Sequence, residues 1–328
     1  MISISQIRSG TNKILVLGNH EPIVQSILDF DYLSGEGEGS ILAIVTGHRG
    51  YAKYFFGRRE ILIPTVSNIS SLESYILNLK SNMWFLNLLS GRRTLSSTLE
   101  CLPSTINNLR SDFVGGALFA ENVPELHSLQ IISTIHDLPS TRLVVGPASI
   151  GLLVPGVLKL GPIGGITEDQ IGEAKLTVPG HVAVLSASGG MTNELINIAI
   201  SSGHRLSFAL SFGGDRFPVL SPREAFLLAE RDPETKAVLY YGELGGEDEY
   251  ELVKLKEEGK LTKKVIAHIA GTVADLFPES PQFGHAKAKA DKEKVTARAK
   301  REALAAAGFS VSNSFTEFIK LVANVRPL

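Results

Sequence analysis

His285 is the side chain in this sequence best suited to covalent chemistry, and it follows Gly284 in a long loop of the second half of the chain. A histidine can act as a general base, or as a nucleophile that carries a group, when a nearby acid holds its ring. Glu243 offers such an acid because it ends an apolar run among glycines, although alone it would be interpreted as a solvated loop residue. A phosphoryl group fits this pair best, since a phosphohistidine needs a carboxylate to orient the imidazole and helix N-termini to receive the phosphate.

A turn of small residues at Ser188, Gly189 and Gly190 is a candidate anion cradle. It opens a predicted helix, so its backbone N–H groups and the positive end of the helix dipole can point at a phosphate or a carboxylate. The alternative is an ordinary serine N-cap followed by glycines that allow close packing.

A glycine-acid loop follows the next predicted strand and contains Gly214, Asp215 and Arg216. In an open α/β sheet, ligands bind beyond the carboxyl ends of the strands. Four consecutive strand ends therefore offer a cradle, a glycine-acid loop, a carboxylate and a histidine on the same edge of one sheet. Chance explains each of these features singly, but less easily all four together.

Short β-branched runs alternate with segments of helical period along nearly the whole chain, which is typical of crossover units and parallel sheets. In the first half the predicted strands are 13–17, 41–45, 61–63, 83–89, 113–119 and 142–145, and the predicted helices are 22–30, 69–80, 93–110 and 124–138. In the second half the predicted strands are 182–185, 206–211, 237–242, 264–268 and 309–312, and the predicted helices are 190–202, 222–231, 247–259, 286–307 and 314–323. The sequence thus predicts an α/β fold with two parallel sheets.

Residues 146–180 interrupt this alternation with glycine, proline and isolated apolar residues, which is the composition of a connecting segment. We place a domain boundary there and expect one domain over residues 1–152 and a second over residues 153–328.

The first half carries weaker signals. Its first strand is followed by Gly18 without the glycine-rich fingerprint of a dinucleotide fold, so NAD is disfavoured. Ser90, Arg92 and Arg93 follow the strand at 83–89, where paired guanidiniums could meet phosphates. A solvated helix start is an equally good interpretation of these residues.

The composition is that of a folded globular chain: 328 residues, 44% hydrophobic and 20% charged, with a net charge of −2. This balance predicts neither a nucleic-acid nor a membrane partner. The single cysteine excludes an internal disulfide and a cysteine-based zinc site, and we expect no metal ligands. The N-terminus lacks a leader pattern and no apolar run is long enough to span a membrane, so we expect a cytoplasmic protein. The acidic stretch 243–260 and the basic stretch 286–302 are interpreted as solvated helix faces.

An ordered set of motifs resembles the family of the succinyl-CoA synthetase α-subunit and, more closely, ATP-citrate lyase. In the second half these motifs are VAVLSASGGMTNE at 182–194, FGGDRFP at 212–218, YGELGG at 241–246, KEEGKLTKKVIAHIAGT at 256–272 and QFGHAKA at 282–288. In the first half they are ILDFDYL at 27–33, KYFFGRREILIPTVSNI at 53–69 and VVGPASIGLLVPG at 144–156. The resemblance implies a Rossmann-like CoA-binding domain followed by a flavodoxin-like ligase domain.

The resemblance also implies a mechanism, that of the small subunit of an ATP-dependent acid–CoA ligase that forms citryl-CoA. His285 matches the histidine that takes a phosphoryl group from ATP, and Glu243 matches the carboxylate that steadies it. The turn at 188–190 matches the helix start that receives phosphate. Ser90 and Arg92 match positions that contact CoA.

Further expectations concern citrate and the partner. Citrate needs several donors, which the turn at 188–190 and the loop at 214–216 can supply in part. The resemblance implies an ATP-grasp β-type partner subunit that binds ATP and Mg²⁺, in a hetero-oligomer. Because the sequence stops at Leu328, directly after its last predicted helix, we expect the thioester to be made without being cleaved.

Three positions depart from the family pattern. Lys287 replaces a usual glycine, Ala187 replaces a frequent arginine, and Arg93 replaces a small residue. Lys287 either crowds the loop or pairs with the phosphate. Three alternatives therefore stay open: a ligase for succinate or another small acid, a fragment of a longer lyase, and a non-catalytic CoA-binding subunit.

Overall fold

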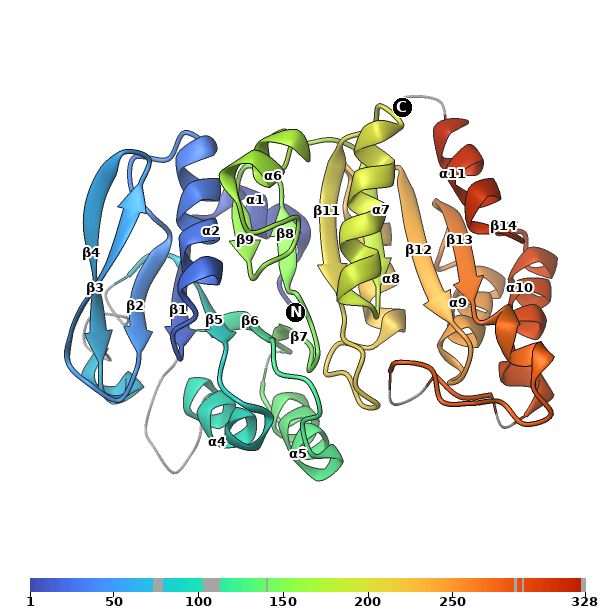
Figure 1. Cartoon of the computed structure of the whole chain (residues 1–328), viewed down its shortest axis with the longest axis horizontal. Helices are drawn as coiled ribbons and strands as arrows, with labels where there is room; N and C mark the ends of the chain where they lie inside the picture. The colour runs from blue at the N-terminus through green and yellow to red at the C-terminus, as the bar shows by residue number, and fades with distance from the viewer. Residues whose placement is uncertain (73–78, 103–112, 140, 286–287, 291, 326–328) are drawn as a thin grey trace.

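The structure is a computed structural model that describes residues 1–72, 79–102, 113–139, 141–285, 288–290 and 292–325 (Figure 1). In the first half its elements are α1 (Ile4–Ser9), β1 (Asn12–Leu17), α2 (Glu21–Leu33), β2 (Ile41–Val45), β3 (Gly50–Phe56), β4 (Arg59–Val66), η1 (Ile69–Leu72), β5 (Asn82–Asn87), α4 (Gly91–Cys101), β6 (Phe113–Leu118), α5 (Glu125–His136) and β7 (Leu143–Val145). In the second half they are β8 (Leu152–Val154), β9 (Leu158–Leu160), α6 (Glu168–Glu173), β10 (Val182–Ser186), α7 (Gly189–Ser201), β11 (Leu206–Ser211), α8 (Pro222–Arg231), β12 (Ala237–Glu243), α9 (Asp248–Glu257), β13 (Lys264–Ala270), η2 (Thr272–Leu276), η3 (Glu293–Val295), α10 (Ala297–Ala306), β14 (Ser310–Ser312) and α11 (Phe315–Ala323).

The first sheet has seven strands in the order β3-β4-β2-β1-β5-β6-β7, and all of its pairs are parallel except β3 with β4. Strand β1 is buried on both faces, as a central parallel strand must be. Its residues Ile14 and Val16 pack in one cluster with α2, whereas Leu15 and Leu17 pack in another with residues of α4 and α5. Helices therefore cover both faces of this sheet.

The second sheet also has seven strands, in the order β14-β13-β12-β10-β11-β8-β9. Strands β10 to β14 are parallel, and the β8–β9 hairpin closes the edge by pairing antiparallel with β11. Helices α7 and α11 cover one face, and α8, α9 and α10 cover the other (Figure 1). The predicted α/β class with two sheets is confirmed, and the antiparallel strands β3 and β8 make both sheets mixed.

Four predictions about the elements need correction or completion. Residues 146–180 are more than a connection, because they form β8, β9 and α6 and supply one edge of the second sheet. The predicted strand at 61–63 is part of a longer hairpin, β3–β4. The helix predicted from residue 286 begins only at Ala297, where the Thr296 hydroxyl caps it by accepting the N–H of Ala299. The predicted helices at 69–80 and 93–110 extend in part outside the described residues.

The charged stretches are also not simply solvated faces. Three of their side chains, Glu249, Lys300 and Arg301, are buried. Helices α9 and α10 pack against each other, and Lys300 of α10 pairs with Glu249 of α9. Arg301 donates to the Asn313 carbonyl and the Thr272 hydroxyl. Periodicity missed this because lysine and arginine count as surface residues unless a partner compensates their burial.

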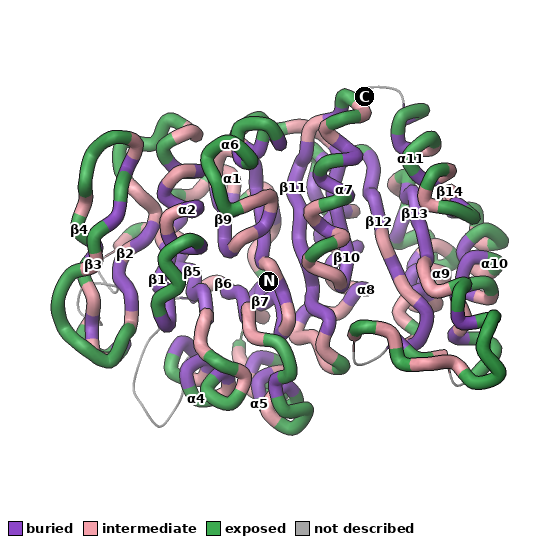
Figure 2. Tube along the Cα trace, viewed as in Figure 1, coloured by how far each residue is buried: buried purple, intermediate pink, exposed green. Residues whose placement is uncertain are grey.

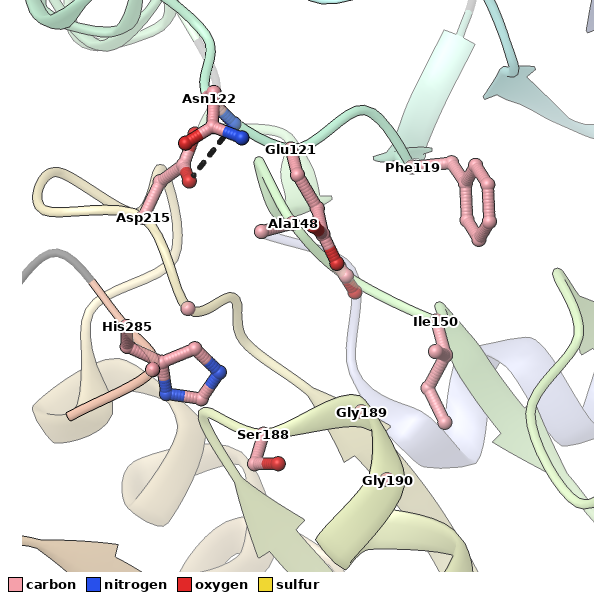
Figure 3. A pocket seen from close by; sticks show the side chains of 13 residues that line it. Phe119, Glu121, Asn122, Ala148, Ile150, Ser188, Gly189, Gly190, Asp215 and His285 are labelled. Atoms are coloured by element: carbon pink, nitrogen blue, oxygen red, sulfur yellow. Dashed lines mark hydrogen bonds between the residues drawn. The ribbon is translucent and has the colours of Figure 1, made fainter.

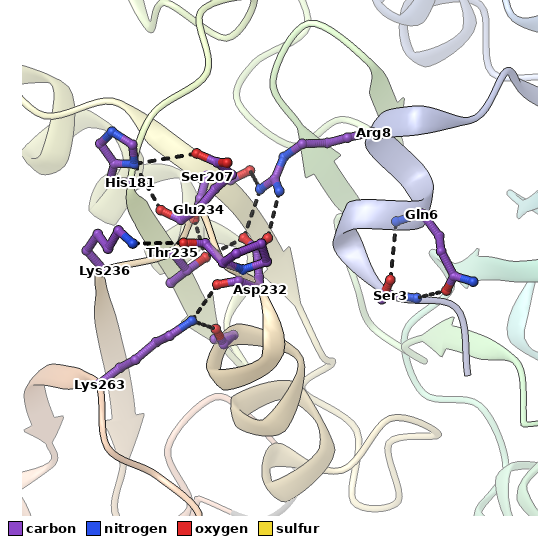
Figure 4. A network of polar contacts seen from close by, with 12 residues as sticks. Ser3, Gln6, Arg8, His181, Ser207, Asp232, Glu234, Thr235, Lys236 and Lys263 are labelled. Atoms are coloured by element: carbon purple, nitrogen blue, oxygen red, sulfur yellow. Dashed lines mark hydrogen bonds and ion pairs between the residues drawn. The ribbon is translucent and has the colours of Figure 1, made fainter.

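One hydrophobic cluster runs through both sheets, as the continuous buried strands in Figure 2 show. A partly buried ion pair also joins the two halves. The Arg8 guanidinium donates to both carboxylate oxygens of Asp232, at 2.6 and 2.8 Å, and to the Ser207 carbonyl at 3.2 Å (Figure 4). In the described part of the chain, every helix falls short of the length and apolarity that a membrane span requires.

Candidate active site

His285 and Glu243 meet, although 42 positions separate them in the chain. The Nδ1 atom of His285 lies 2.8 Å from Oε1 and 3.0 Å from Oε2 of Glu243. Both side chains are partly exposed, at 28% and 21%. A proton on Nδ1 satisfies this contact and leaves the lone pair of the neutral ring on Nε2. The pair is thus arranged to present Nε2 as a nucleophile or base.

The His285 ring lies at a cavity of about 420 Å³ (Figure 3). Second-half residues form one wall: Ser188, Gly189, Gly190, Gly214, Asp215, Gly284 and His285. The other wall comes from the loop after β6 and the β7–β8 connection: Phe119, Glu121, Asn122, Ala148, Ser149 and Ile150. The cavity therefore lies between the carboxyl ends of strands from the two sheets, where ligands bind in such folds.

The N-terminus of α7 forms part of this cavity. Ser188 is the N-cap, and its hydroxyl accepts the N–H of Met191 at 3.3 Å. Gly189 and Gly190 begin the helix, where the first N–H groups have no intrahelical acceptor. A side chain at Gly189 would collide with Ile150, because its Cβ would lie 2.5 Å from Cγ2, whereas Gly190 has open space around it. This helix start is a cradle of the kind that binds phosphate or carboxylate groups.

The loop after β11 lies close to the histidine. A Cβ atom at Gly214 would lie only 2.5 to 2.6 Å from the ring atoms Cδ2 and Nε2 of His285, so glycine leaves room for the imidazole. The Asp215 carboxylate accepts the N–H groups of Asn122 and Val123, at 3.2 and 3.0 Å. Burial raises the pKa of this carboxyl, although the two N–H donors lower it. Asp215 therefore connects this loop to the opposite wall.

Arg216, by contrast, lies outside the lining of the cavity. Its Nη1 atom lies 3.3 Å from Oε1 of Glu125, at the start of α5. Both side chains of this pair are well exposed, at 60% and 56%. The role of Arg216 as a substrate ligand stays a prediction.

Ser90 and Arg92 lie at the N-terminus of α4, and both are exposed. Gly91 between them packs against the loop of the first-half wall, since its Cβ would lie 3.1 Å from the Asn122 carbonyl oxygen and 3.2 Å from that of Glu121. These two residues thus lie beside the cavity without lining it.

Sequence reasoning missed the residues of the first-half wall, among them Phe119, Glu121 and Asn122. Figure 3 shows the Glu121 side chain in the cavity. Asn122 adopts a left-handed conformation, with φ 56°, which asparagine tolerates better than most residues. The rule about strand ends could have found them, because they directly follow β6.

Ala187, one of the three departures from the family pattern, lies within the described residues. Ala187 is 7% exposed, and its carbonyl accepts the Ser211 hydroxyl at 3.2 Å. The side chain at this position is therefore packed inside the protein. Lys287 lies outside the described residues.

Comparison with known protein families identifies the class of domain in the second half of the chain. Residues 185–310 match the CoA-ligase family, so the second half of the chain contains a CoA-ligase domain. The glycine-rich helix start, Glu243 and His285 all fall within the matched range.

The relatives are more specific. The chain is 35% identical over 316 residues to ATP-citrate synthase beta chain protein 1 of Arabidopsis thaliana, which covers 96% of this chain and 50% of the relative. It is 35% identical to human ATP-citrate synthase, over 95% of this chain and 28% of the relative. The resemblance to the ATP-citrate lyase family is thus confirmed. The chain spans about half the length of the plant relative.

Solved structures agree. The ATP citrate lyase from Methanothrix soehngenii, in complex with citrate and coenzyme A, superposes with a TM-score of 0.87 at 35% identity, covering 95% of this chain and 49% of that one. A dinucleotide-forming acetyl-coenzyme A synthetase from Ca. Korarchaeum cryptofilum shares the fold, with a TM-score of 0.65 at 15% identity.

Proposed function

We propose that this chain is the α-type subunit of an ATP-dependent acid–CoA ligase that works as a citryl-CoA synthetase. The reaction converts ATP, citrate and CoA into ADP, phosphate and citryl-CoA. The observation that carries the proposal is the contact between His285 and Glu243, at 2.8 Å, on a cavity that the N-terminus of α7 also lines. The similarity to ATP-citrate synthases and to a lyase structure with citrate and coenzyme A supports citrate as the acid.

The first step assigns His285 as the nucleophile. Its Nε2 atom attacks the γ-phosphorus of ATP, the bond to the bridging oxygen breaks, and ADP leaves. Glu243 holds the Nδ1 proton and stabilises the positive charge that develops on the ring. The N–H groups at Gly189 and Gly190 receive the charged phosphoryl oxygens.

The next two steps consume the phosphohistidine. A citrate carboxylate oxygen attacks phosphorus, the P–N bond breaks, and an acyl phosphate forms. The CoA sulfur, after losing its proton to solvent, attacks the acyl carbon, and phosphate leaves. Donors near Ser188, with Gly214, Asp215 and Arg216 in the loop after β11, are our candidates for holding citrate.

CoA is assigned to the first half of the chain. Ser90 and Arg92 are the candidate contacts, because the helix start that they flank packs against the loop of the first-half wall. This division gives a CoA-binding domain over residues 1–152 and a ligase domain over residues 153–328. ATP and Mg²⁺ are assigned to an ATP-grasp partner subunit, which makes the active enzyme a hetero-oligomer.

The test combines the chain with its ATP-grasp partner, γ-labelled ATP, Mg²⁺ and a panel of acids. We expect a phosphoryl label that is acid-labile and base-stable, as a phosphoramidate is, and none in His285→Asn. Mass spectrometry of the quenched reaction should show citryl-CoA as the preferred thioester.

Other outcomes would overturn parts of the proposal. Turnover without a label on His285 would favour direct formation of the acyl phosphate. Succinyl-CoA as the preferred product would replace citrate as the substrate. No thioester from any acid would favour a non-catalytic CoA-binding subunit.

A further inference from the structure

Lys300 is a buried lysine directly behind Glu243. It lies in α10 and is 1% exposed. Its Nζ atom lies 2.8 Å from the backbone carbonyl oxygen of Glu243 and 2.6 Å from Oε2 of Glu249, and it also donates to the carbonyl of Gly245. An ammonium group has three donors. Two of them are hydrogen-bonded to carbonyls of the loop that presents Glu243, and the charge of the ammonium is paired with the Glu249 carboxylate.

The loop needs such an anchor. Gly245 and Gly246 have positive φ angles, 82° and 62°, and glycine gains chain freedom when it is not held. The backbone supplies two further restraints, from the Leu244 N–H to the Ala270 carbonyl and from the Gly245 N–H to the Val295 carbonyl. Lys300 adds a charged restraint from helix α10.

Glu249 makes burial of this lysine possible. Its side chain is 3% exposed, and its other oxygen accepts the Tyr240 hydroxyl at 3.0 Å. A buried ammonium without a counter-charge would be strongly destabilising. The pair thus provides a fixed charge that holds the backbone of the loop.

We propose that Lys300 is a positioning residue for phosphoryl transfer, which fixes the Glu243 carboxylate against His285 Nδ1. This role rests on the proposed function of that pair. Lys300 acts through Glu243, because its contacts are with the loop and with Glu249. Removing it should let the carboxylate shift, and a misplacement of about 1 Å can reduce a rate substantially.

The experiment must separate positioning from folding. Lys300→Met alone leaves Glu249 buried without its counter-charge, so the main variant is the double substitution Glu249→Gln with Lys300→Met. Removing both charges together is often close to neutral for stability, and glutamine keeps an oxygen for the Tyr240 hydroxyl. The reference is the parent protein, in which both charges are present.

A matched control comes from an exposed pair near the same loop. Lys294 pairs with Glu247, and these side chains are 53% and 59% exposed. Lys294→Met removes a lysine from the same region without touching the carbonyls of the loop. We expect it to behave as the parent protein does.

The first measurement is the ¹⁵N NMR spectrum of the chain with ¹⁵N-labelled histidine, recorded without substrates. The signals of His285 are identified as those that are missing from the spectrum of His285→Asn. In the parent we expect the Nδ1–H tautomer. In the folded double variant we expect a shift toward Nε2–H. The second measurement is the rate of label transfer to His285 in the complex with the partner, which should fall about 10-fold, with CoA affinity unchanged.

The outcomes distinguish this proposal from the proposed function. If the parent is never phosphorylated, the function fails, yet the tautomer still decides whether Lys300 positions Glu243. A double variant that melts with the parent and keeps both the tautomer and the rate would overturn the positioning role. If Lys294→Met lost the tautomer and the labelling rate to the same extent, the effect of Lys300 would be a general effect of charge and not positioning.

Discussion

The two walls of the cavity differ in chemistry. The second-half wall presents His285, a serine and the N-terminus of α7, with Glu243 behind the histidine, and its lining carboxylate, Asp215, accepts two N–H groups of the opposite loop. The first-half wall presents a loop with the carboxylate of Glu121. Donors and a helix dipole attract anionic groups, whereas a carboxylate repels them. Under the proposed function, this difference favours the second-half wall for the phosphoryl and citrate groups and the first-half wall for the thiol end of CoA.

The walls are also held differently. Behind the second-half wall, the buried pair of Lys300 and Glu249 holds the loop of Glu243. The first-half wall is held from across the cavity, by the Asp215 carboxylate on two of its N–H groups. Changes in the second-half wall should therefore affect chemistry, and changes in the first half should affect binding.

Among the substitutions that test the difference between the walls, Glu243→Gln should have the largest effect on the rate of phosphoryl transfer. Glutamine keeps the shape of the side chain but loses the charge that orients the imidazole and stabilises its cation. We expect phosphoryl transfer to His285 to slow on the order of 100-fold. Rapid-quench measurement of the label in the complex with the partner tests this rate.

The same variant also tests the division between the walls. Calorimetric titration with CoA should give nearly the parent affinity, because Glu243 lies in the second half of the chain. A collapse of CoA binding in Glu243→Gln would show that the two walls do not have separate tasks.

Arg92→Ala should instead weaken CoA binding and leave phosphoryl transfer unchanged, and its effect should be smaller than that of Glu243→Gln. Loss of one exposed guanidinium contact to a phosphate should weaken CoA affinity about 10-fold, while the rate of His285 labelling stays at the parent value. Arg231→Ala is the matched control, because Arg231 is an exposed arginine at the end of α8. Unchanged CoA affinity in Arg92→Ala would remove Arg92 from the CoA site.

Much of the fold was predictable because the strands are short apolar runs between helices with clear periodicity. The predicted strand at 206–211 matches β11, and the predicted helix at 222–231 matches α8. The segments that escaped prediction are held by tertiary contacts. Strands β8 and β9 have three residues each and are stable only as an edge of the second sheet.

The same distinction applies to the site. The rule that parallel strands end at one edge placed Glu243 and His285 on the same edge of the sheet, and the family resemblance implied that they are partners. Lys300 could not be found in this way, because in the sequence it is one of several lysines in a basic stretch. Only the packing of α10 against α9 and β13 shows that it is buried and bonded to the loop.

A second buried lysine, Lys159, sharpens the comparison because its hydrogen bonds within the described residues go to a hydroxyl and a carbonyl and not to a carboxylate. It is 0% exposed in β9, and it donates to the Ser26 hydroxyl at 2.8 Å and to the Gly161 carbonyl at 2.9 Å. Burial lowers the pKa of Lys159 to about 7, although Asp29 and Asp31 raise it. This lysine joins α2 of the first half to the edge of the second sheet, far from the chemistry that we propose.

Its effect should therefore be on stability alone, and it should depend on pH. Between pH 7 and pH 10.5 the unfolded chain keeps the Lys159 proton that the folded protein releases, so the free energy of unfolding rises with pH in this window. Relative to Lys159→Met, the parent should gain about 2 kcal/mol between pH 7 and pH 9, at most about 1.4 kcal/mol per pH unit. Denaturant titrations across this range measure the difference, and Lys53→Met, at a lysine that is 71% exposed, should show none. A flat difference for Lys159→Met would mean that Lys159 keeps its proton when buried, as a lysine with a counter-charge does.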